Sequence, residues 1–459
     1  MSQLLRLATL ALVFLVPAAA RAADGGLYLY LQPLPAEASR LTLEIASVSA
    51  VSGSGAERPL ALAFTVVREA DGRRQRLLAS GRLPEGPYTG LAVTIRRATL
   101  RGPDGEVSLA VPEGPVRADV PLTVARRRPV LVWLSLKVPE RLAGASALSP
   151  AFAAVVPPRP IADHAGFVAN TRSNTVTVFD KQIMQAVAVI DTCAGPSGLA
   201  LDQRRRRLYV ACPNVDEIES FDVVAGELIE TADASPGDRP RELALSPDGS
   251  TLVSANQGSN SLGIYDTGPL RREDRVNVGS GPGAVVVEPS GRRAFVFNTL
   301  SNSVSVVDIA GRAVAATLST EAPPLRGQFN ARGDRLYVIH DRSPFMTAFD
   351  TQQMTTVARV RLGGPASAIA VDRVRGLICL GSTADTAIEF YDPNVLLPLY
   401  TMKTRAGASY LAIVPDDSDL YMVSPDTRSL LVGRLADRKV VSEIDVGDGP
   451  CWVAIMGEK

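Results

Sequence analysis

The chain has 459 residues, of which 46% are hydrophobic and 21% charged, a composition that excludes wholesale disorder. Its length requires more than one domain or a repeat array. Lys plus Arg and Asp plus Glu each number 48, and the zero net charge argues against a nucleic-acid binder. Only two His and four Cys are present, so multi-haem and His-rich metal sites have little support.

The N-terminus has the pattern of a secretory signal peptide. Arg6 supplies a positive charge, Leu7 to Val16 form a short apolar stretch, and Ala20-Arg21-Ala22 gives an A-x-A cleavage signal. We predict a signal peptide over residues 1–22 and a periplasmic or extracellular mature protein. No later stretch is apolar for long enough to span a bilayer, so we expect no membrane span after cleavage.

Residues 23–150 show the alternation of half-buried strands. Clear examples are Leu41–Ile45, Leu91–Ile95 and Val130–Leu136, with Gly and Pro turns between such segments. We predict a small antiparallel β-sandwich here, followed by a Pro-rich linker over 151–160. Residues 161–459 then form a separate domain.

Charge divides between the two parts. Residues 27–150 carry 16 basic and 11 acidic side chains (net +5), whereas residues 151–459 carry 30 and 36 (net −6). The basic runs at 73–76 and 126–128 are open to three interpretations: domain docking, an anionic partner, or solvated turns. We favour solvated turns, because both runs lie between strand-like segments.

From about residue 160 a unit of about 42 residues repeats. A strand-ending Asp recurs with spacings of 42, 44, 42, 42 and 42, at Asp180, Asp222, Asp266, Asp308, Asp350 and Asp392. A proline-like turn marker follows the same period, at Pro196, Pro240, Pro282, Pro324, Pro365, Ala408 and Pro450. A third marker is a polar residue after a strand, at Asn170, Cys212, Asn256, Asn298, His340, Ser382 and Ser424. Four short strands per unit and seven units predict a seven-bladed β-propeller in an all-β chain.

The repeat resembles the YVTN-type β-propeller family of bacterial periplasmic and surface-layer proteins. The resemblance is carried by Leu208–Ala211, Ser259–Asp266 and Gly281–Val285, and it implies a fold more than an activity. In that family the proline turn leads into the innermost strand of a blade. The resemblance therefore implies that Trp452–Met456 completes the blade begun by Gly166–Asn170, which closes the ring and removes a free sheet edge.

The N-terminal part resembles a family of exported bacterial domains of unknown function that have a prealbumin-like sandwich. The matching segments are Leu83–Leu91 and Ala98–Leu100. No activity is implied by this resemblance.

Candidate ligand-binding residues lie on the loops that surround one mouth of the propeller channel. They are Asn170, Asn256, Asn298, His340, Arg172, Arg241, Arg326, Arg342 and Arg405. His340 replaces an Asn-like residue and is a candidate general base, although a loop imidazole bonded to the backbone is the alternative that we favour. The Arg residues are a candidate funnel for a carboxylate or phosphate, unless Asp238, Glu242 and Asp341 pair with them. The repeated Asn residues are more consistent with turn structure than with catalysis, which needs asymmetry.

Three cysteines, Cys193, Cys212 and Cys451, map near the propeller face that carries the candidate ligand-binding loops. A Cys193–Cys212 disulfide is our first expectation, a Cys193–Cys451 disulfide the second, and a thiolate metal site a remote third. Cys379 falls inside a strand and is expected to be a buried thiol.

Two functions remain open. We expect an exported, non-catalytic and monomeric binding or scaffold protein whose partner is a protein or envelope ligand, without nucleic acid, cofactor or metal. The alternative is a propeller enzyme, a lactone hydrolase or a cofactor-dependent oxidoreductase, with its site at the funnel. The sequence has no haem-attachment motif, no nucleophile elbow and no phosphate-binding loop, so no catalytic residue is assigned.

Overall fold

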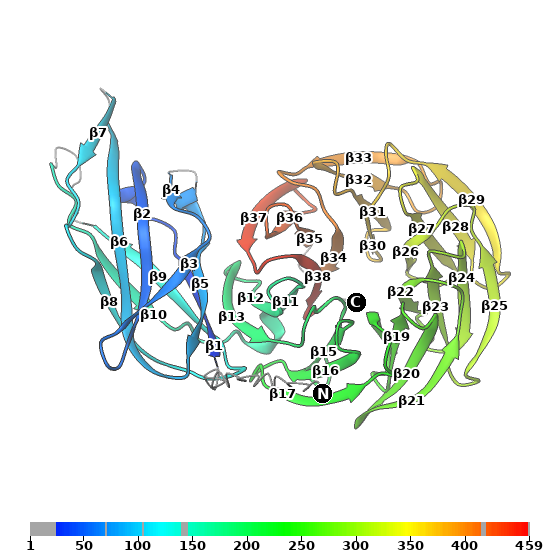
Figure 1. The fold of residues 1–459 in the computed structure, drawn as a ribbon. Coiled ribbons are helices and arrows are strands. Elements are labelled where there is room, and N and C mark those ends of the chain that lie inside the picture. The colour runs from blue at the N-terminus through cyan, green and yellow to red at the C-terminus, as the bar shows by residue number, and fades with distance from the viewer. Residues whose placement is uncertain (1–23, 69–70, 103–104, 139–145, 415–418, 458–459) are drawn as a thin grey trace, which may run out of the picture.

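Each period of the repeat folds into a four-stranded antiparallel sheet, and seven sheets form the blades of a ring (Figure 1). The computed structural model describes residues 24–68, 71–102, 105–138, 146–414 and 419–457. It confirms the all-β fold class and the seven-bladed propeller. The predicted signal peptide over residues 1–22 lies outside the described part of the chain.

Blades 2 to 7 each use four consecutive strands, numbered from the channel outward. Blade 2 has β14 (Leu199–Asp202), β15 (Arg207–Cys212), β16 (Glu217–Asp222) and β17 (Leu228–Asp233). Blade 3 has β18 (Pro240–Leu245), β19 (Thr251–Asn256), β20 (Ser261–Thr267) and β21 (Leu270–Asn277). Blade 4 has β22 (Pro282–Val287), β23 (Arg293–Asn298), β24 (Ser303–Asp308) and β25 (Ala313–Ser319). Blade 5 has β26 (Pro324–Phe329), β27 (Arg335–His340), β28 (Phe345–Asp350) and β29 (Thr355–Arg361). Blade 6 has β30 (Ala368–Asp372), β31 (Leu377–Gly381), β32 (Ala387–Tyr391) and β33 (Pro398–Lys403). Blade 7 has β34 (Tyr410–Val414), β35 (Asp419–Ser424), β36 (Ser429–Arg434) and β37 (Lys439–Asp445).

Blade 1 joins the two ends of the repeat region. It contains β11 (Ala165–Asn170), β12 (Thr175–Asp180), β13 (Gln185–Asp191) and the last strand, β38 (Pro450–Ile455). Strand β38 pairs antiparallel with β11, with Phe167 opposite Ala454 and Val168 opposite Val453. The ring therefore closes as expected, because the C-terminal strand supplies the innermost position of the first blade.

The repeated Asp residues have a structural role at the turn between the third and fourth strands. The Asp180 carboxylate accepts hydrogen bonds from the backbone amides of Gln182 (2.8 Å) and Ile183 (3.3 Å). Asp350 does the same for Gln352 and Gln353 in blade 5, four repeats later. The Asp period thus marks Asx-type turns, which are local structures that an Asp side chain stabilises.

The N-terminal domain is one curled ten-stranded sheet and not two separate sheets. Its strand order is β10-β9-β1-β5-β3-β2-β6-β7, with β4 paired to β2 and β8 paired to β6. Strand β3 pairs with both β2 and β5, so it joins halves that would be distinct sheets in a sandwich. The elements are β1 (Asp24–Leu31), η1 (Ala36–Ala38), β2 (Leu41–Ser52), β3 (Glu57–Leu62), β4 (Val66–Val67), η2 (Asp71–Arg73), β5 (Arg76–Pro84), β6 (Gly86–Gly102), β7 (Gly105–Leu109), β8 (Val116–Val124), β9 (Val130–Lys137) and β10 (Ala151–Val155).

The first half of the predicted linker belongs to this sheet. Residues 151–155 form β10, which pairs antiparallel with β9, and the irregular connection covers 156–161 before the short turn η3 (Ala162–His164). Phe152 is buried in the core of the N-terminal domain, which explains why an apolar segment precedes the Pro-rich stretch.

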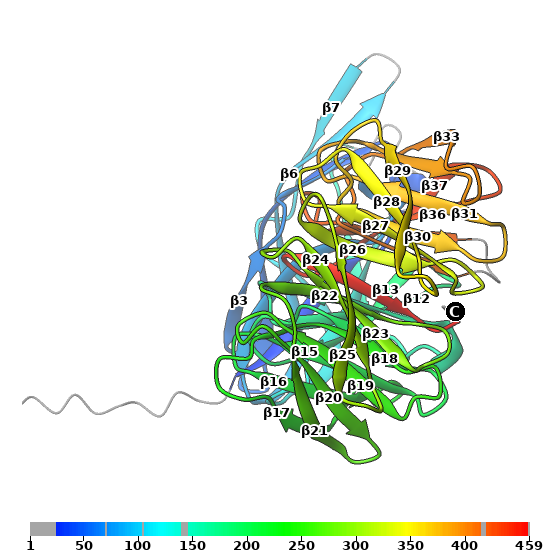
Figure 2. The ribbon, with the colours of Figure 1, turned by 90° about the vertical axis from the view of Figure 1, so that its right-hand side faces the viewer.

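The N-terminal sheet packs against the outer rim of the ring at blades 1 and 7 (Figures 1 and 2). The burial of the outermost strand of each blade shows which blades this contact covers. Six of the seven residues of β13 are buried, whereas the equivalent strand β29 in blade 5 has none. Tyr30 and Leu131 of the N-terminal sheet share a core cluster with β13, so the contact is apolar at its centre.

Ion pairs surround this apolar contact. The Arg74 guanidinium lies 2.5 Å and that of Arg76 2.9 Å from the Asp445 carboxylate of blade 7. Arg127 and Arg128 pair with Glu219 and Glu227 of blade 2. Both basic runs therefore serve domain docking, and our preference for solvated turns was wrong. Among the described residues no helix has the length and apolar character of a membrane span.

Candidate functional site

The inner strands of the blades surround a cavity of about 490 Å³ at one mouth of the channel. This volume is within the range of small-molecule sites. The polar and aromatic side chains in its wall include Thr171, Ser197, Asn214, Arg239, Arg241, Glu242, Gln257, Arg326, Ser367, Ser409, Cys451 and Trp452.

Arg326 is the best-positioned cation in this cavity. Its guanidinium carbon lies 4.9 Å from the centre of the Tyr410 ring and 5.3 Å from that of Trp452. The two rings contact each other, with centroids 4.0 Å apart. Cation–π contacts of this kind restrict the guanidinium to one orientation. Within the described residues, Nε and Nη1 of Arg326 are buried and have no hydrogen-bond acceptor.

Glu242 lies opposite and forms the anionic half of the site. Its Oε2 is 3.8 Å from Nη2 of Arg326, and its Oε1 accepts a 3.4 Å hydrogen bond from the Val285 amide. The Glu242 side chain is only 7% exposed. Burial raises the pKa of its carboxyl to about 7, although Arg326, the Val285 amide and Arg241 each lower it. The group therefore exchanges a proton near neutral pH.

These side chains occupy one position of the repeat. Glu242, Arg326, Tyr410 and Trp452 each lie two residues after the proline-like marker of their blade. In blades 3 and 5 a register shift follows the marker, between Pro240 and Glu242 and between Pro324 and Arg326. A β-bulge of this kind re-aims the next side chain. The site thus arises where one repeat position carries a different residue in each blade.

The Cys451 thiol closes one side of the cavity. Its Sγ accepts a hydrogen bond from Thr171 (3.1 Å) and donates to the Ser197 carbonyl (3.2 Å). Burial raises the pKa of this thiol to about 11, so it is protonated at neutral pH. A thiol in this state is a poor nucleophile.

Two of the nine candidate residues line the cavity, namely Arg241 and Arg326. Arg172 is exposed and pairs with Asp448, and Arg342 is 93% exposed beside Asp341. Arg405 contributes instead to a groove on the N-terminal domain. Glu242, Tyr410 and Trp452 were not among the candidates, although their shared repeat position was visible in the sequence.

The Asn residues at the ends of the second strands are buried and bond within their own blades. Asn170 Nδ2 donates to Thr177 Oγ1 and Asn298 Nδ2 donates to Ser305 Oγ, both at 2.9 Å and both seven residues along the chain. Asn256 Nδ2 donates to Ser261 Oγ, five residues along the chain, at 3.2 Å. These side chains do not line the cavity.

His340 takes over the same structural role. Its Nε2 lies 2.8 Å from Thr347 Oγ1, again seven residues along, and its Nδ1 lies 3.0 Å from the Ala322 carbonyl. The ring is 2% exposed, and burial lowers its pKa. The carbonyl only accepts, so Nδ1 donates and Nε2 accepts from Thr347. His340 is a buried neutral imidazole and does not reach the cavity.

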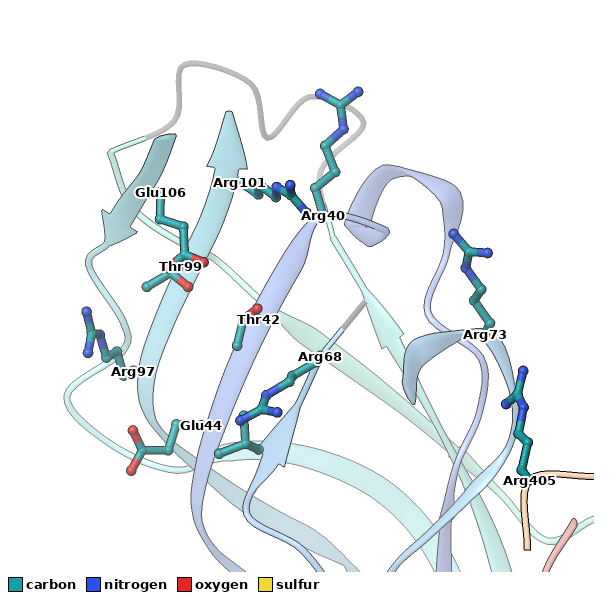
Figure 3. Close-up of a pocket in the computed structure, with 11 residues that line it drawn as sticks. Arg40, Thr42, Glu44, Arg68, Arg73, Arg97, Thr99, Arg101, Glu106 and Arg405 are labelled. Carbon is teal, nitrogen blue, oxygen red and sulfur yellow. The ribbon is translucent and has the colours of Figure 1, made fainter. Parts of the chain in front are cut away.

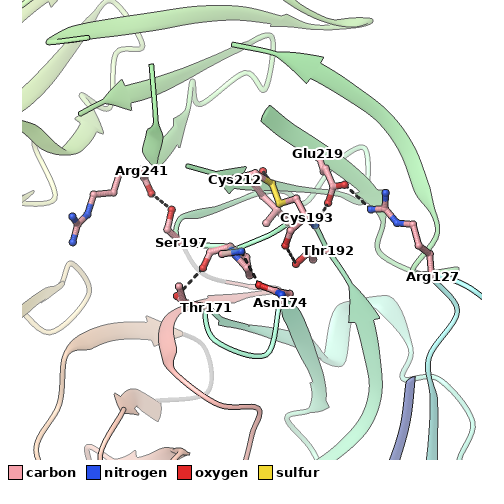
Figure 4. Close-up of a disulfide and its surroundings, with 12 residues drawn as sticks. Arg127, Thr171, Asn174, Thr192, Cys193, Ser197, Cys212, Glu219 and Arg241 are labelled. Carbon is pink, nitrogen blue, oxygen red and sulfur yellow. Dashed lines mark hydrogen bonds and ion pairs between the residues drawn. A yellow bond between two sulfur atoms is a disulfide. The ribbon is translucent and has the colours of Figure 1, made fainter. Parts of the chain in front are cut away.

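Cys193 and Cys212 form a disulfide at the edge of blade 2 (Figure 4). The Cys193 amide donates to Glu219 Oε2 at 2.9 Å, and Glu219 also pairs with Arg127 of the N-terminal sheet. Potential ligand atoms of Cys193, Cys212 and Glu219 lie within 4.8 Å of one another. Because the two sulfurs are bonded and the carboxylate is paired, this group does not offer a metal a set of free ligands.

Comparisons with known proteins agree on the propeller. Residues 165–276 match the family described as "Lactonase, 7-bladed beta-propeller". A curated relative is the uncharacterized protein YwhL of Bacillus subtilis (strain 168), 26% identical over 325 residues, or 68% of each chain. The YVTN-type resemblance of the propeller and the resemblance of the N-terminal domain to a prealbumin-like family stay predictions.

Solved structures share the fold at low identity. Kuenenia stuttgartiensis hydrazine synthase matches 61% of this chain and 96% of its own at 19% identity and a TM-score of 0.54. A functionally unknown protein from Desulfotomaculum acetoxidans matches 64% and 100% (12% identity, TM-score 0.58). The dihydro-heme d1 dehydrogenase NirN, solved in complex with DHE, matches 70% and 80% (14% identity, TM-score 0.51).

Proposed function

We propose that the channel mouth hydrolyses a small lactone, with Arg326 and Glu242 as its catalytic residues. The observation that carries the proposal is the pairing of these two largely buried side chains at 3.8 Å in the wall of the channel-mouth cavity, with two guanidinium N–H positions that have no protein acceptor among the described residues. The match of residues 165–276 to a lactonase-type propeller family supports the same class of reaction. Two of the structural neighbours, hydrazine synthase and a dehydrogenase, are also enzymes.

The chemistry follows from the positions of the two groups. Ionised Glu242 takes a proton from a water molecule, whose oxygen then forms a bond to the lactone carbonyl carbon. Arg326 donates N–H groups to the oxyanion that develops on the carbonyl oxygen. When the ring C–O bond breaks, the leaving oxygen takes the proton back from Glu242. The product is an open-chain hydroxy acid, and Glu242 ends in its starting state.

The surroundings suit this reaction. The aromatic pair Tyr410–Trp452 holds the guanidinium of Arg326 in place before substrate binds, which lowers the cost of ordering it. Arg241 lines the same cavity and hydrogen-bonds Gln257 at 3.2 Å, so a second cation is close to the acidic product. Of the two functions expected from the sequence, these features support the enzyme over the non-catalytic scaffold.

The test measures the acid released from a panel of γ- and δ-lactones. The rate is the rate at which base must be added to hold the pH constant. Wild-type protein is expected to turn over at least one member. Glu242→Gln should lower kcat/KM by roughly 10²–10⁴-fold and Arg326→Met by roughly 10²–10³-fold. The matched control is Arg342→Gln, an exposed residue outside the cavity, which should stay within about twofold of wild type.

The pH profile adds an independent readout. Because Glu242 acts in its ionised form, kcat/KM should rise with pH and level off above about 7. Saturable lactone binding without turnover would reject catalysis and return the protein to the binding class. Turnover that survives Glu242→Gln unchanged would place the reaction elsewhere in the molecule.

A further inference from the structure

A groove of about 740 Å³ lies on the outer face of the N-terminal sheet, where β2, β4, β6 and β7 run side by side (Figure 3). One edge is completed by Arg73 of η2 and by Arg405, which comes from the propeller. The groove is separate from the channel mouth, and the channel chemistry does not use it.

Strand register arranges the groove in rows. Thr42 on β2 is opposite Thr99 on β6, Glu44 is opposite Arg97, and Arg101 is opposite Glu106 on β7. Residues two apart on a strand share a face and are about 7 Å apart. The two threonines therefore form a hydroxyl row with a guanidinium-bearing row on each side.

The charge of this groove is unbalanced. Among the described residues six Arg and two Glu line it, a formal charge of +4 (six minus two). Of these, Arg405 also lies 3.9 Å from Glu443 of the propeller, and Glu44 pairs with Arg96. Arg40, Arg68, Arg97 and Arg101 make no ion pair with any residue in the described ranges. The docking arginines of the same domain are different, since Arg74, Arg76 and Arg127 each face a carboxylate of the propeller. Gathered unpaired cations raise the local positive potential and attract anions.

We propose that this groove binds an anionic glycan, a sugar chain that carries carboxylate or phosphate groups. Guanidinium groups bind both kinds of anion with paired hydrogen bonds. The hydroxyls of Thr42 and Thr99 and the carboxylates of Glu44 and Glu106 match the neutral hydroxyl groups of a sugar, which donate and accept. The lining residues include no aromatic side chain, so the groove lacks the stacking surface that single-stranded nucleic acid requires.

The experiment measures binding of three labelled polyanions to the full chain by fluorescence anisotropy. The probes are oligogalacturonate, a glycerol-phosphate polymer and a single-stranded DNA of matched charge, at about 50 and 200 mM salt. We expect saturable binding of at least one of the two sugar-type polymers, tighter than the DNA. The polymer that binds more tightly identifies the anion.

Variants locate the site. Arg97→Gln with Arg101→Gln should weaken glycan binding at least about tenfold, since two charge-assisted contacts are lost. The control Arg58→Gln with Arg117→Gln removes the same charge from exposed residues outside the groove and should stay within about twofold. Thr42→Val leaves the charge unchanged and should weaken glycan binding several-fold without changing DNA binding. Thermal unfolding of each variant checks that it is folded.

Three results would overturn the proposal. The first is equal weakening by the groove pair and the control pair, which would mean general electrostatic attraction. The second is tightest binding of the DNA. The third is a Thr42→Val variant with unchanged glycan affinity, because a site that does not use its hydroxyl row does not recognise sugar.

Discussion

Arg127 of the N-terminal sheet places its guanidinium 2.5 Å from the Glu219 carboxylate of blade 2, which is only 1% exposed. Glu219 also accepts a hydrogen bond from the Cys193 amide, so one buried carboxylate connects the N-terminal sheet, blade 2 and the disulfide (Figure 4). A buried charge that loses its partner is costly, and this gives a test of how the two domains are joined.

Arg127→Met should lower the free energy of unfolding by about 1–3 kcal/mol, because Glu219 would stay buried without its cation. The lower limit of this range allows for the 43% exposure of the Arg127 side chain, which weakens the ion pair. Urea denaturation measures the change. The control is Arg96→Met, which breaks an exposed pair with Glu44 and should cost less than about 1 kcal/mol. Equal effects of the two variants would contradict the docking role.

His340 is predicted to act through stability alone. His340→Ala should cost about 1–3 kcal/mol, since Thr347 and the Ala322 carbonyl would lose buried hydrogen-bond partners. His340→Asn should cost less, because Asn298 makes the equivalent bond in blade 4. Both folded variants should retain wild-type lactone hydrolysis. Loss of turnover in a stable His340→Asn protein would show a catalytic role that the geometry does not support.

Glu242 should make stability fall as pH rises. The pKa of its carboxyl is about 7 in the folded protein against an ordinary value of 4.5, so the folded state holds the extra proton between these two pH values. The unfolding free energy should therefore decrease from about pH 4.5 to about pH 7 and then level off, by on the order of 3 kcal/mol for this group. Glu242→Gln should remove this component. An unchanged pH dependence in that variant would mean that the carboxyl is not buried in solution.

Strand β38, which closes the ring, should be required for the propeller to fold as a monomer. A chain that ends at Val446 lacks β38 and leaves β11 with an unpaired edge. We expect it to aggregate or to lose cooperative unfolding, measured by size-exclusion chromatography with light scattering and by thermal melting. The control ends at Gly457 and keeps β38, so it should behave as wild type. A monomeric, cooperatively folded short chain would argue that the closure adds little.

Cys451 should react slowly with iodoacetamide at neutral pH. Because its pKa is about 11, the rate should increase about tenfold for each pH unit between 7 and 10. Mass spectrometry of the labelled peptide measures the rate, and Cys451→Ser provides the blank. Fast, pH-independent alkylation would indicate a thiolate and a different electrostatic environment at the channel mouth.

The pairing of β38 with β11 was predicted from the resemblance to the YVTN-type family. The period of 42 residues was enough to predict the propeller and its seven blades. It is sufficient because the turn and strand signals are local and recur in every blade. The N-terminal sheet was harder, since nothing in alternating strands says whether β3 pairs on one side or on both. The register in the structure decides that β3 joins the two halves.

The site was predicted only in part, and the reason is physical. Loop position drew attention to His340 and the Asn residues, but those side chains turn into the blade and bond hydroxyls five or seven residues away. Glu242 and Arg326 come together because the ring brings separate blades around one channel. The sequence did contain a signal, since both follow their proline marker by two residues and break the repeat at that position.

The buried strand β13 has a consequence for how the chain assembles during synthesis. Of the strands described, those of the N-terminal sheet are synthesised before blade 1, blade 1 follows without its innermost strand, and β38 comes after all the other blades. Domains generally begin to fold in this order. Until β38 has been synthesised, the apolar outer strand of blade 1, β13, can already pack against the N-terminal sheet. We therefore expect the sheet to act on newly made chains as a built-in chaperone for the first blade.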